Sequence, residues 1–143
     1  MIELSEQHIR DLYTGAIFTA CMINPDWAHE QMDRVLIQLR EGGSRLQLCS
    51  PEDLEPDGLV VAVGYVSNGL PPSDLRPVGD EFARSLRILQ DALDRPIAGV
   101  MPLAAGGLNA MVPPLAAMQF GVPIVDADPM GRVFPLVNQT VFT

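Results

Sequence analysis

The chain has 143 residues, of which 48% are hydrophobic, and its formal net charge is −9. This length suits one domain, because two domains of about 70 residues would each have a marginal core. We therefore predict a single domain over residues 1–143. The negative charge repels phosphate backbones and anionic lipid surfaces, so neither nucleic acid nor a membrane is an expected partner.

The residue types narrow the possible chemistry. All nine basic residues are Arg, which excludes a Schiff-base lysine, a pyridoxal-phosphate lysine and a P-loop lysine. Cys21 and Cys49 lack metal-site or redox spacing and are expected to be buried thiols. We expect no cofactor and no metal. The N-terminus does not resemble a signal peptide, and no stretch approaches the roughly 18 apolar residues of a membrane span, so we expect a cytoplasmic protein.

Helical periodicity predicts two helices in the N-terminal part. Ser5 and Glu6 begin the first, whose apolar positions share one face as far as Ala20. Asp26 caps the second, which runs to about Arg40 and ends at the glycine pair 42–43. A short strand is expected at 45–49.

From residue 58 to residue 126, the predicted order is strand, helix, strand, helix, strand. The runs Gly58–Val66, Ile97–Leu103 and Val122–Asp126 have the composition of strands buried on both faces of a parallel sheet. Two consecutive βαβ units predict an α/β fold, a three-layer sandwich with a mostly parallel central sheet and helices on both faces.

The connecting helices have clear start and stop signals. One begins at 79–81, and the other has Pro113-Pro114 in its first turn, where a missing N–H costs little, and ends at Gly121. The final stretch, 129–143, is expected to form a loop and an edge strand.

Ligands bind open parallel sheets beyond the carboxyl ends of the strands. Polar or glycine-rich loops follow all three predicted strands: Asn68 after the first, Gly106, Gly107 and Asn109 after the second, and Asp126, Asp128 and Arg132 after the third. We expect these loops to lie together and to line one pocket for a small molecule.

The third loop is the most suggestive chemically. Of two neighbouring carboxylates, one can act as a base if its pKa is raised by burial or by the like charge. We expect Asp128 to be this base and Asp126 to brace the loop. Arg132 and the backbone N–H groups of Gly106 and Gly107 would then hold a developing negative charge. The alternatives are that Arg132 pairs with one aspartate as a brace, and that the glycine pair is only a tight turn.

The run Gly106–Pro135 reads GGLNAMVPPLAAMQFGVPIVDADPMGRVFP and resembles the N-terminal domain of the S-methyl thiohydantoin desulfurase family. The GG and Asn, the following helix, the G-V-P-I-V-D-A-D segment and the M-G-R-x-F-P segment carry the resemblance. The opening helix and the acidic start at 79–81 extend it over nearly the whole chain. The resemblance implies removal of sulfur, as methanethiol, from S-methyl thiohydantoin, and association with hydantoinase or oxoprolinase proteins.

Three family features differ here. The glycine-rich run after the first helix reads TACMINP at 19–25, and the Glu that usually precedes the GG pair is Ala104. Family members also usually continue into a β-rich second domain, so we expect self-association into a homo-oligomer, with 20–23 as a candidate contact.

Two functional hypotheses follow. The first is a diverged small enzyme that uses carboxylate acid/base chemistry to hydrolyse, cyclise or isomerise a hydantoin-like or other cyclic amide. The alternative is a non-catalytic binding or accessory subunit that self-associates or pairs with a hydantoinase-like partner.

Overall fold

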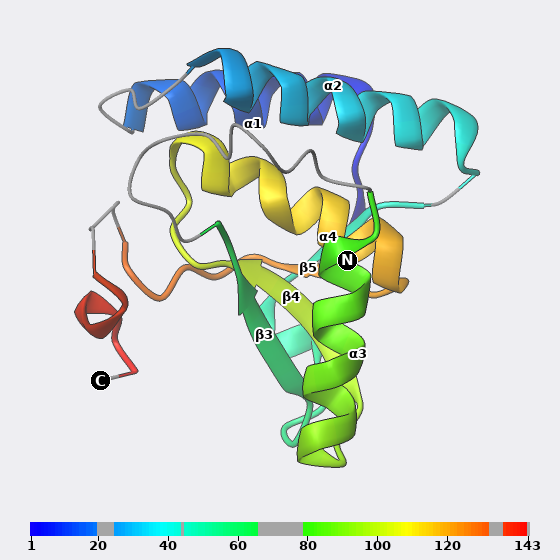
Figure 1. The fold of residues 1–143 in the computed structure, drawn as a ribbon, viewed down its shortest axis with the longest axis vertical. Helices are drawn as coiled ribbons and strands as arrows, with labels where there is room; N and C mark the ends of the chain where they lie inside the picture. The colour runs from blue at the N-terminus through cyan, green and yellow to red at the C-terminus, as the bar shows by residue number, and fades with distance from the viewer. Residues whose placement is uncertain (20–24, 44, 66–78, 132–135, 143) are drawn as a thin grey trace.

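The computed structural model describes residues 1–19, 25–43, 45–65, 79–131 and 136–142. These residues form four α-helices and one five-stranded sheet (Figure 1). The helices are α1 Glu6–Thr19, α2 Pro25–Glu41, α3 Glu81–Leu93 and α4 Val112–Phe120. The strands are β1 Ile2–Glu3, β2 Gln47–Cys49, β3 Leu59–Val63, β4 Ile97–Pro102 and β5 Ile124–Val125. Three short 3₁₀ helices are η1 Pro51–Asp53, η2 Gly107–Met111 and η3 Val137–Gln139.

The sheet is mostly parallel, with the strand order β1-β2-β5-β4-β3. Strands β3, β4, β5 and β2 run parallel to one another, and only β1 is antiparallel to its neighbour. The three strands predicted between residues 58 and 126 are therefore confirmed as parallel neighbours. Their β-branched, apolar runs suit positions that are covered from both sides.

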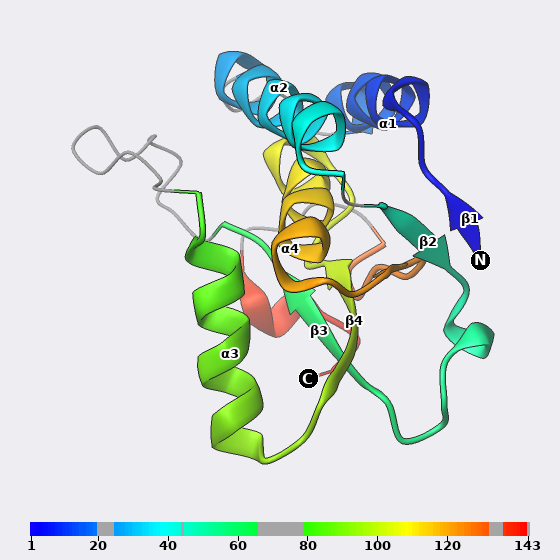
Figure 2. The ribbon, with the colours of Figure 1, turned by 90° about the vertical axis from the view of Figure 1, so that its right-hand side faces the viewer.

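Helix α4 lies between the sheet and the helices α1 and α2 (Figure 2). All seven residues from Val112 to Met118 are buried, which explains why its sequence is apolar around its whole circumference. Its prolines occupy the first turn, as predicted, and Gly121 ends it with φ +84°, a left-handed conformation that favours glycine.

The side chains of the sheet alternate between two apolar clusters. Leu59, Val61 and Val63 of β3 belong to the larger cluster, together with side chains from all four α-helices. Val60 and Ala62 belong to a smaller cluster with Cys49, Met101, Val125, Leu54 and Ala127, none of which lies in an α-helix. The two clusters mark the two faces of the sheet, since successive side chains of a strand point to opposite faces.

The helices therefore stack in two layers over one face. Figure 2 shows α4 next to the sheet, with α1 and α2 lying beyond it. The α/β class, the layered sandwich and the mostly parallel sheet are confirmed. The placement of helices differs from our expectation of helices on both faces, because in the described residues α2 packs on α4 and η2, and α1 packs on α2 and η2.

The C-terminal stretch also differs from the expected edge strand. Its described part contains η3, in which Gln139 N–H donates to the carbonyl of Leu136 at 3.0 Å and Gln139 Oε1 accepts from the N–H of Leu136 at 3.0 Å. These local hydrogen bonds use backbone groups that a strand would offer to a neighbour. The predicted contact segment 20–23, with Cys21, lies outside the described residues. Among the described helices, none has the length and apolar composition needed to cross a membrane.

Candidate functional site

The loops that follow β3 and β4 are joined by Asn109. Its Oδ1 accepts a hydrogen bond from the N–H of Tyr65 at 2.8 Å, and its Nδ2 donates to the carbonyl of Tyr65 at 3.5 Å. Gly64 leaves room for this contact, because a Cβ there would lie 3.3 Å from Asn109 Oδ1. Asn109 thus ties η2 to the carboxyl end of β3.

The loops that follow β4 and β5 are joined by Asp128. Its Oδ2 accepts from the N–H of Ala105 at 2.7 Å, and its Oδ1 accepts from the N–H groups of Met130 at 2.7 Å and Gly131 at 3.1 Å. The carboxylate therefore holds two loops together. The sequence led us to expect Asp126 as the brace, but Asp126 is exposed and the bracing contacts belong to Asp128.

The remaining predicted site residues divide into two groups. Gly106 is buried and donates its N–H to the carbonyl of Ala104 at 2.8 Å, and Gly107 begins η2 with φ +56°. This geometry fits the tight-turn interpretation of the glycine pair. Asn68 and Arg132 lie outside the described residues. The described residues contain no cluster of His, Cys, Asp or Glu suited to hold a metal.

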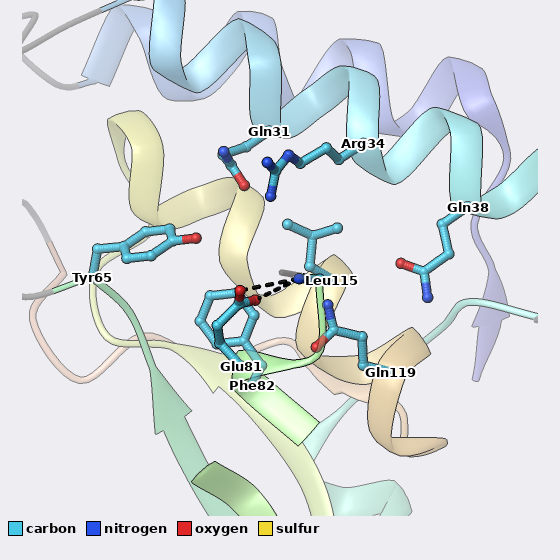
Figure 3. A pocket seen from close by; sticks show the side chains of 9 residues that line it. Gln31, Arg34, Gln38, Tyr65, Glu81, Phe82, Leu115 and Gln119 are labelled. Carbon is cyan, nitrogen blue, oxygen red and sulfur yellow. Dashed lines mark hydrogen bonds between the residues drawn. The ribbon is translucent and has the colours of Figure 1, made fainter. Parts of the chain in front are cut away.

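A cavity lies elsewhere, beyond the carboxyl end of β3 and at the start of α3 (Figure 3). Its volume is ≈ 210 Å³. It is lined by Gln31, Arg34 and Gln38 of α2, by Tyr65, by Gly79, Glu81 and Phe82, and by Leu115 and Gln119 of α4. None of the strand-end residues that are both predicted and described lines it, although Asn109 positions the backbone of Tyr65.

Gln31 is the unusual residue of this cavity. Its side chain is completely buried, and neither Nε2 nor Oε1 has a hydrogen-bond partner among the described residues. Leaving a buried polar group unpaired costs about 1–3 kcal/mol, so such groups are rare and need an explanation. In Figure 3 the amide of Gln31 extends from α2 toward the space between Arg34 and Tyr65. The cavity therefore presents one unused donor and one unused acceptor.

Two opposite charges face this amide. Arg34 extends from α2 and pairs with Glu30 through Nη2 at 3.3 Å, whereas Glu81 lies across the cavity at the start of α3 (Figure 3). The Glu81 carboxylate accepts from the N–H of Gly79 at 3.0 and 3.2 Å.

The ring of Tyr65 is held between Trp27 and Phe82, with centroid separations of 5.1 and 5.4 Å. Burial raises the pKa of the Tyr65 hydroxyl, and the nearby Glu81 carboxylate raises it further, while Arg34 opposes the change. The hydroxyl is therefore protonated at neutral pH and able to donate a hydrogen bond.

Our sequence interpretation missed this site because its residues resemble an ordinary helix surface. Gln31, Arg34 and Gln38 are spaced so that they share one face of α2. The available signal was that Gln31 and Arg34 each immediately precede an inward-facing residue, Met32 and Val35 respectively.

A family model described as S-Me-THD-like, N-terminal domain, matches residues 7–143. No curated protein matches the chain, and no solved structure does.

Proposed function

Because the chain belongs to the family of S-Me-THD-like N-terminal domains, we propose that it binds a small cyclic amide of the hydantoin type in the cavity between α2, α3 and α4. The unpaired amide of Gln31 carries this proposal. The ring of such a ligand presents an adjacent N–H and C=O. The Gln31 side chain offers the complementary acceptor and donor, so two parallel hydrogen bonds would satisfy both partners.

The size of the cavity agrees with a small ring. A volume of ≈ 210 Å³ is several times the roughly 30 Å³ that one water occupies. It is below the range of about 300–1,000 Å³ that is usual for drug-sized ligands. A five-membered heterocycle with a short substituent is therefore the favoured class of ligand.

The groups around the bound ring support acid/base chemistry as the activity. Glu81 supplies a carboxylate, and the protonated Tyr65 hydroxyl supplies a donor. We assign the role of base to Glu81, because Asp128 accepts three backbone hydrogen bonds and does not line the cavity. The resulting reaction would be hydrolysis of the cyclic amide, its formation by cyclisation of the open-chain form with loss of water, or its isomerisation, with Glu81→Gln lowering the rate by about 10²–10⁴.

The binding step is tested by titrating the protein with hydantoin and with S-methyl thiohydantoin, followed by calorimetry or NMR. Gln31→Leu keeps the volume of the side chain and removes both hydrogen-bonding groups. We expect it to weaken binding about 10- to 100-fold, the loss of two hydrogen bonds. 1,3-Dimethylhydantoin, which lacks both ring N–H groups, should bind the wild-type protein with a similar loss.

Gln38→Leu is the matched control, since it makes the same change on the same helix at a position that Figure 3 shows further from Tyr65. It should weaken binding less than Gln31→Leu. Equal affinity of Gln31→Leu and the wild-type protein would refute the site. Binding without turnover in the wild-type protein would favour the non-catalytic subunit over the enzyme.

A further inference from the structure

We infer that this cavity selects cyclic amides that carry a carboxylate, and that Arg34 is the residue that selects them. This inference rests on the proposed function, because it assumes that Gln31 holds the amide edge of the ring. Arg34 follows Gln31 by three residues on α2, and both side chains reach the cavity from the same helix (Figure 3). A single ligand is therefore able to contact both.

The two side chains differ in depth. Gln31 is fully buried, whereas the side chain of Arg34 is 31% exposed. An amide edge bound at Gln31 thus lies inside the cavity, and a substituent that extends toward Arg34 lies near its opening. A short acidic arm on the ring fits this arrangement, because the charged group keeps part of its contact with water.

The guanidinium of Arg34 is only partly engaged in the described contacts. It pairs with Glu30 through a single nitrogen at 3.3 Å, and the Glu30 side chain is 59% exposed. An exposed pair of this kind is weak. A ligand carboxylate that accepts two parallel hydrogen bonds from the guanidinium is a stronger partner, because the planar fork of Arg matches it.

Glu81 gives the bound acid one orientation. Its carboxylate lies across the cavity from Arg34 (Figure 3), so the acidic arm of a ligand is repelled at that wall and attracted at the other. The net charge of −9 opposes any anion, but most of it is screened beyond the Debye length of about 8 Å at physiological salt. The local charge of Arg34 therefore decides the preference.

The test compares hydantoin-5-acetate with hydantoin-5-acetamide, two ligands of nearly equal shape that differ by one negative charge. We expect the wild-type protein to bind the acetate about three- to tenfold more tightly, the size of a partly exposed charge-assisted pair. Arg34→Gln should bind both ligands equally, at the affinity that the wild-type protein has for the acetamide. Glu30→Gln should strengthen acetate binding only, because it removes the competing carboxylate.

The outcomes separate this inference from the proposed function. If the wild-type protein binds both ligands equally, or if Arg34→Gln keeps the preference for the acetate, Arg34 does not select the acid and the cyclic-amide site remains. If neither ligand binds, both proposals are overturned.

Discussion

Two sets of polar residues in this protein differ in whether their side chains have hydrogen-bond partners, and this difference decides their roles. At the strand ends, Asn109 and Asp128 have hydrogen-bond partners on the backbone of neighbouring loops. In the cavity, the amide of Gln31 is more deeply buried and has no hydrogen-bond partner in the part of the chain that the structure describes. Asn109 and Asp128 hold the fold together, whereas Gln31 offers hydrogen bonds to a ligand.

A polar residue at a strand end is therefore not by itself evidence of a catalytic role. A carboxylate whose oxygens already accept three backbone N–H groups has little capacity left for a substrate. A buried amide without a partner lowers stability, and a bound ligand offsets that cost. The two groups should therefore respond to mutation with opposite signs in the free energy of unfolding.

The largest expected effect is at Asp128. Asp128→Ala removes the acceptor of three backbone N–H groups and should lower the free energy of unfolding by about 2–4 kcal/mol, since hydrogen bonds to charged groups contribute the most. Asp128→Asn should lower it by about half as much, because its NH₂ group would face a backbone donor. Urea denaturation measures both variants.

Asp126→Ala is the matched control, because Asp126 is exposed two residues away. Its free energy of unfolding should stay within about 0.5 kcal/mol of the wild-type value. If Asp128→Ala proves as stable as Asp126→Ala, then Asp128 does not brace the loops. That result would support the hypothesis that Asp128 acts as a base.

The next effect has the opposite sign. Gln31→Leu should raise the free energy of unfolding by about 1–2 kcal/mol in the absence of ligand, because it replaces an unpaired buried amide by an apolar side chain of similar size. Thermal or urea denaturation measures this gain. The stabilisation should accompany the loss of ligand binding in the same variant.

Gln90→Leu is the control for this prediction, since Gln90 Oε1 accepts a hydrogen bond from the N–H of Ile97 at 3.1 Å. The same substitution at this paired glutamine should lower stability by about 1 kcal/mol. A destabilised Gln31→Leu would mean that the amide has partners in the folded protein, which contradicts the distinction between the two polar groups.

The smallest effect is on alkaline stability. The folded-state pKa of Tyr65 is raised above its ordinary value of 10.0, first by burial and then by Glu81. Its contribution to stability is therefore complete below that ordinary value and is lost as pH rises through the folded-state pKa. Tyr65→Phe should reduce the loss of stability above pH 10.0, by less than about 1 kcal/mol per pH unit.

Denaturation curves at several alkaline pH values test this effect. Burial also raises the pKa of the Cys49 thiol. The protein with Tyr65 and the Tyr65→Phe variant should therefore be compared in a Cys49→Ala background. An unchanged alkaline slope in Tyr65→Phe would show that this hydroxyl titrates as in the unfolded chain, contrary to its partly buried position in the cavity.

Much of the fold was predictable because its signals are local. The β-branched runs of β3, β4 and β5 and the Pro113 and Gly121 boundaries of α4 depend on composition and on neighbouring residues. They predicted the parallel strands and the helix between them correctly. The run Gly106–Pro135 carried the resemblance to the family, and the family model match confirms it.

The hydrogen-bond partners of the polar side chains could not be predicted from the sequence. Gln31, Tyr65, Glu81 and Gln119 are distant in sequence, and α2, α3 and α4 bring them to one cavity. The packing of α2 against η2 and α4 accompanies the burial of Gln31 on a helix face whose sequence resembles a solvated surface. The three parallel strands and the helices between them could be predicted from the sequence, since these elements depend on local periodicity. The sequence did not determine which polar side chains would be paired, because hydrogen bonding depends on atoms that folding brings together.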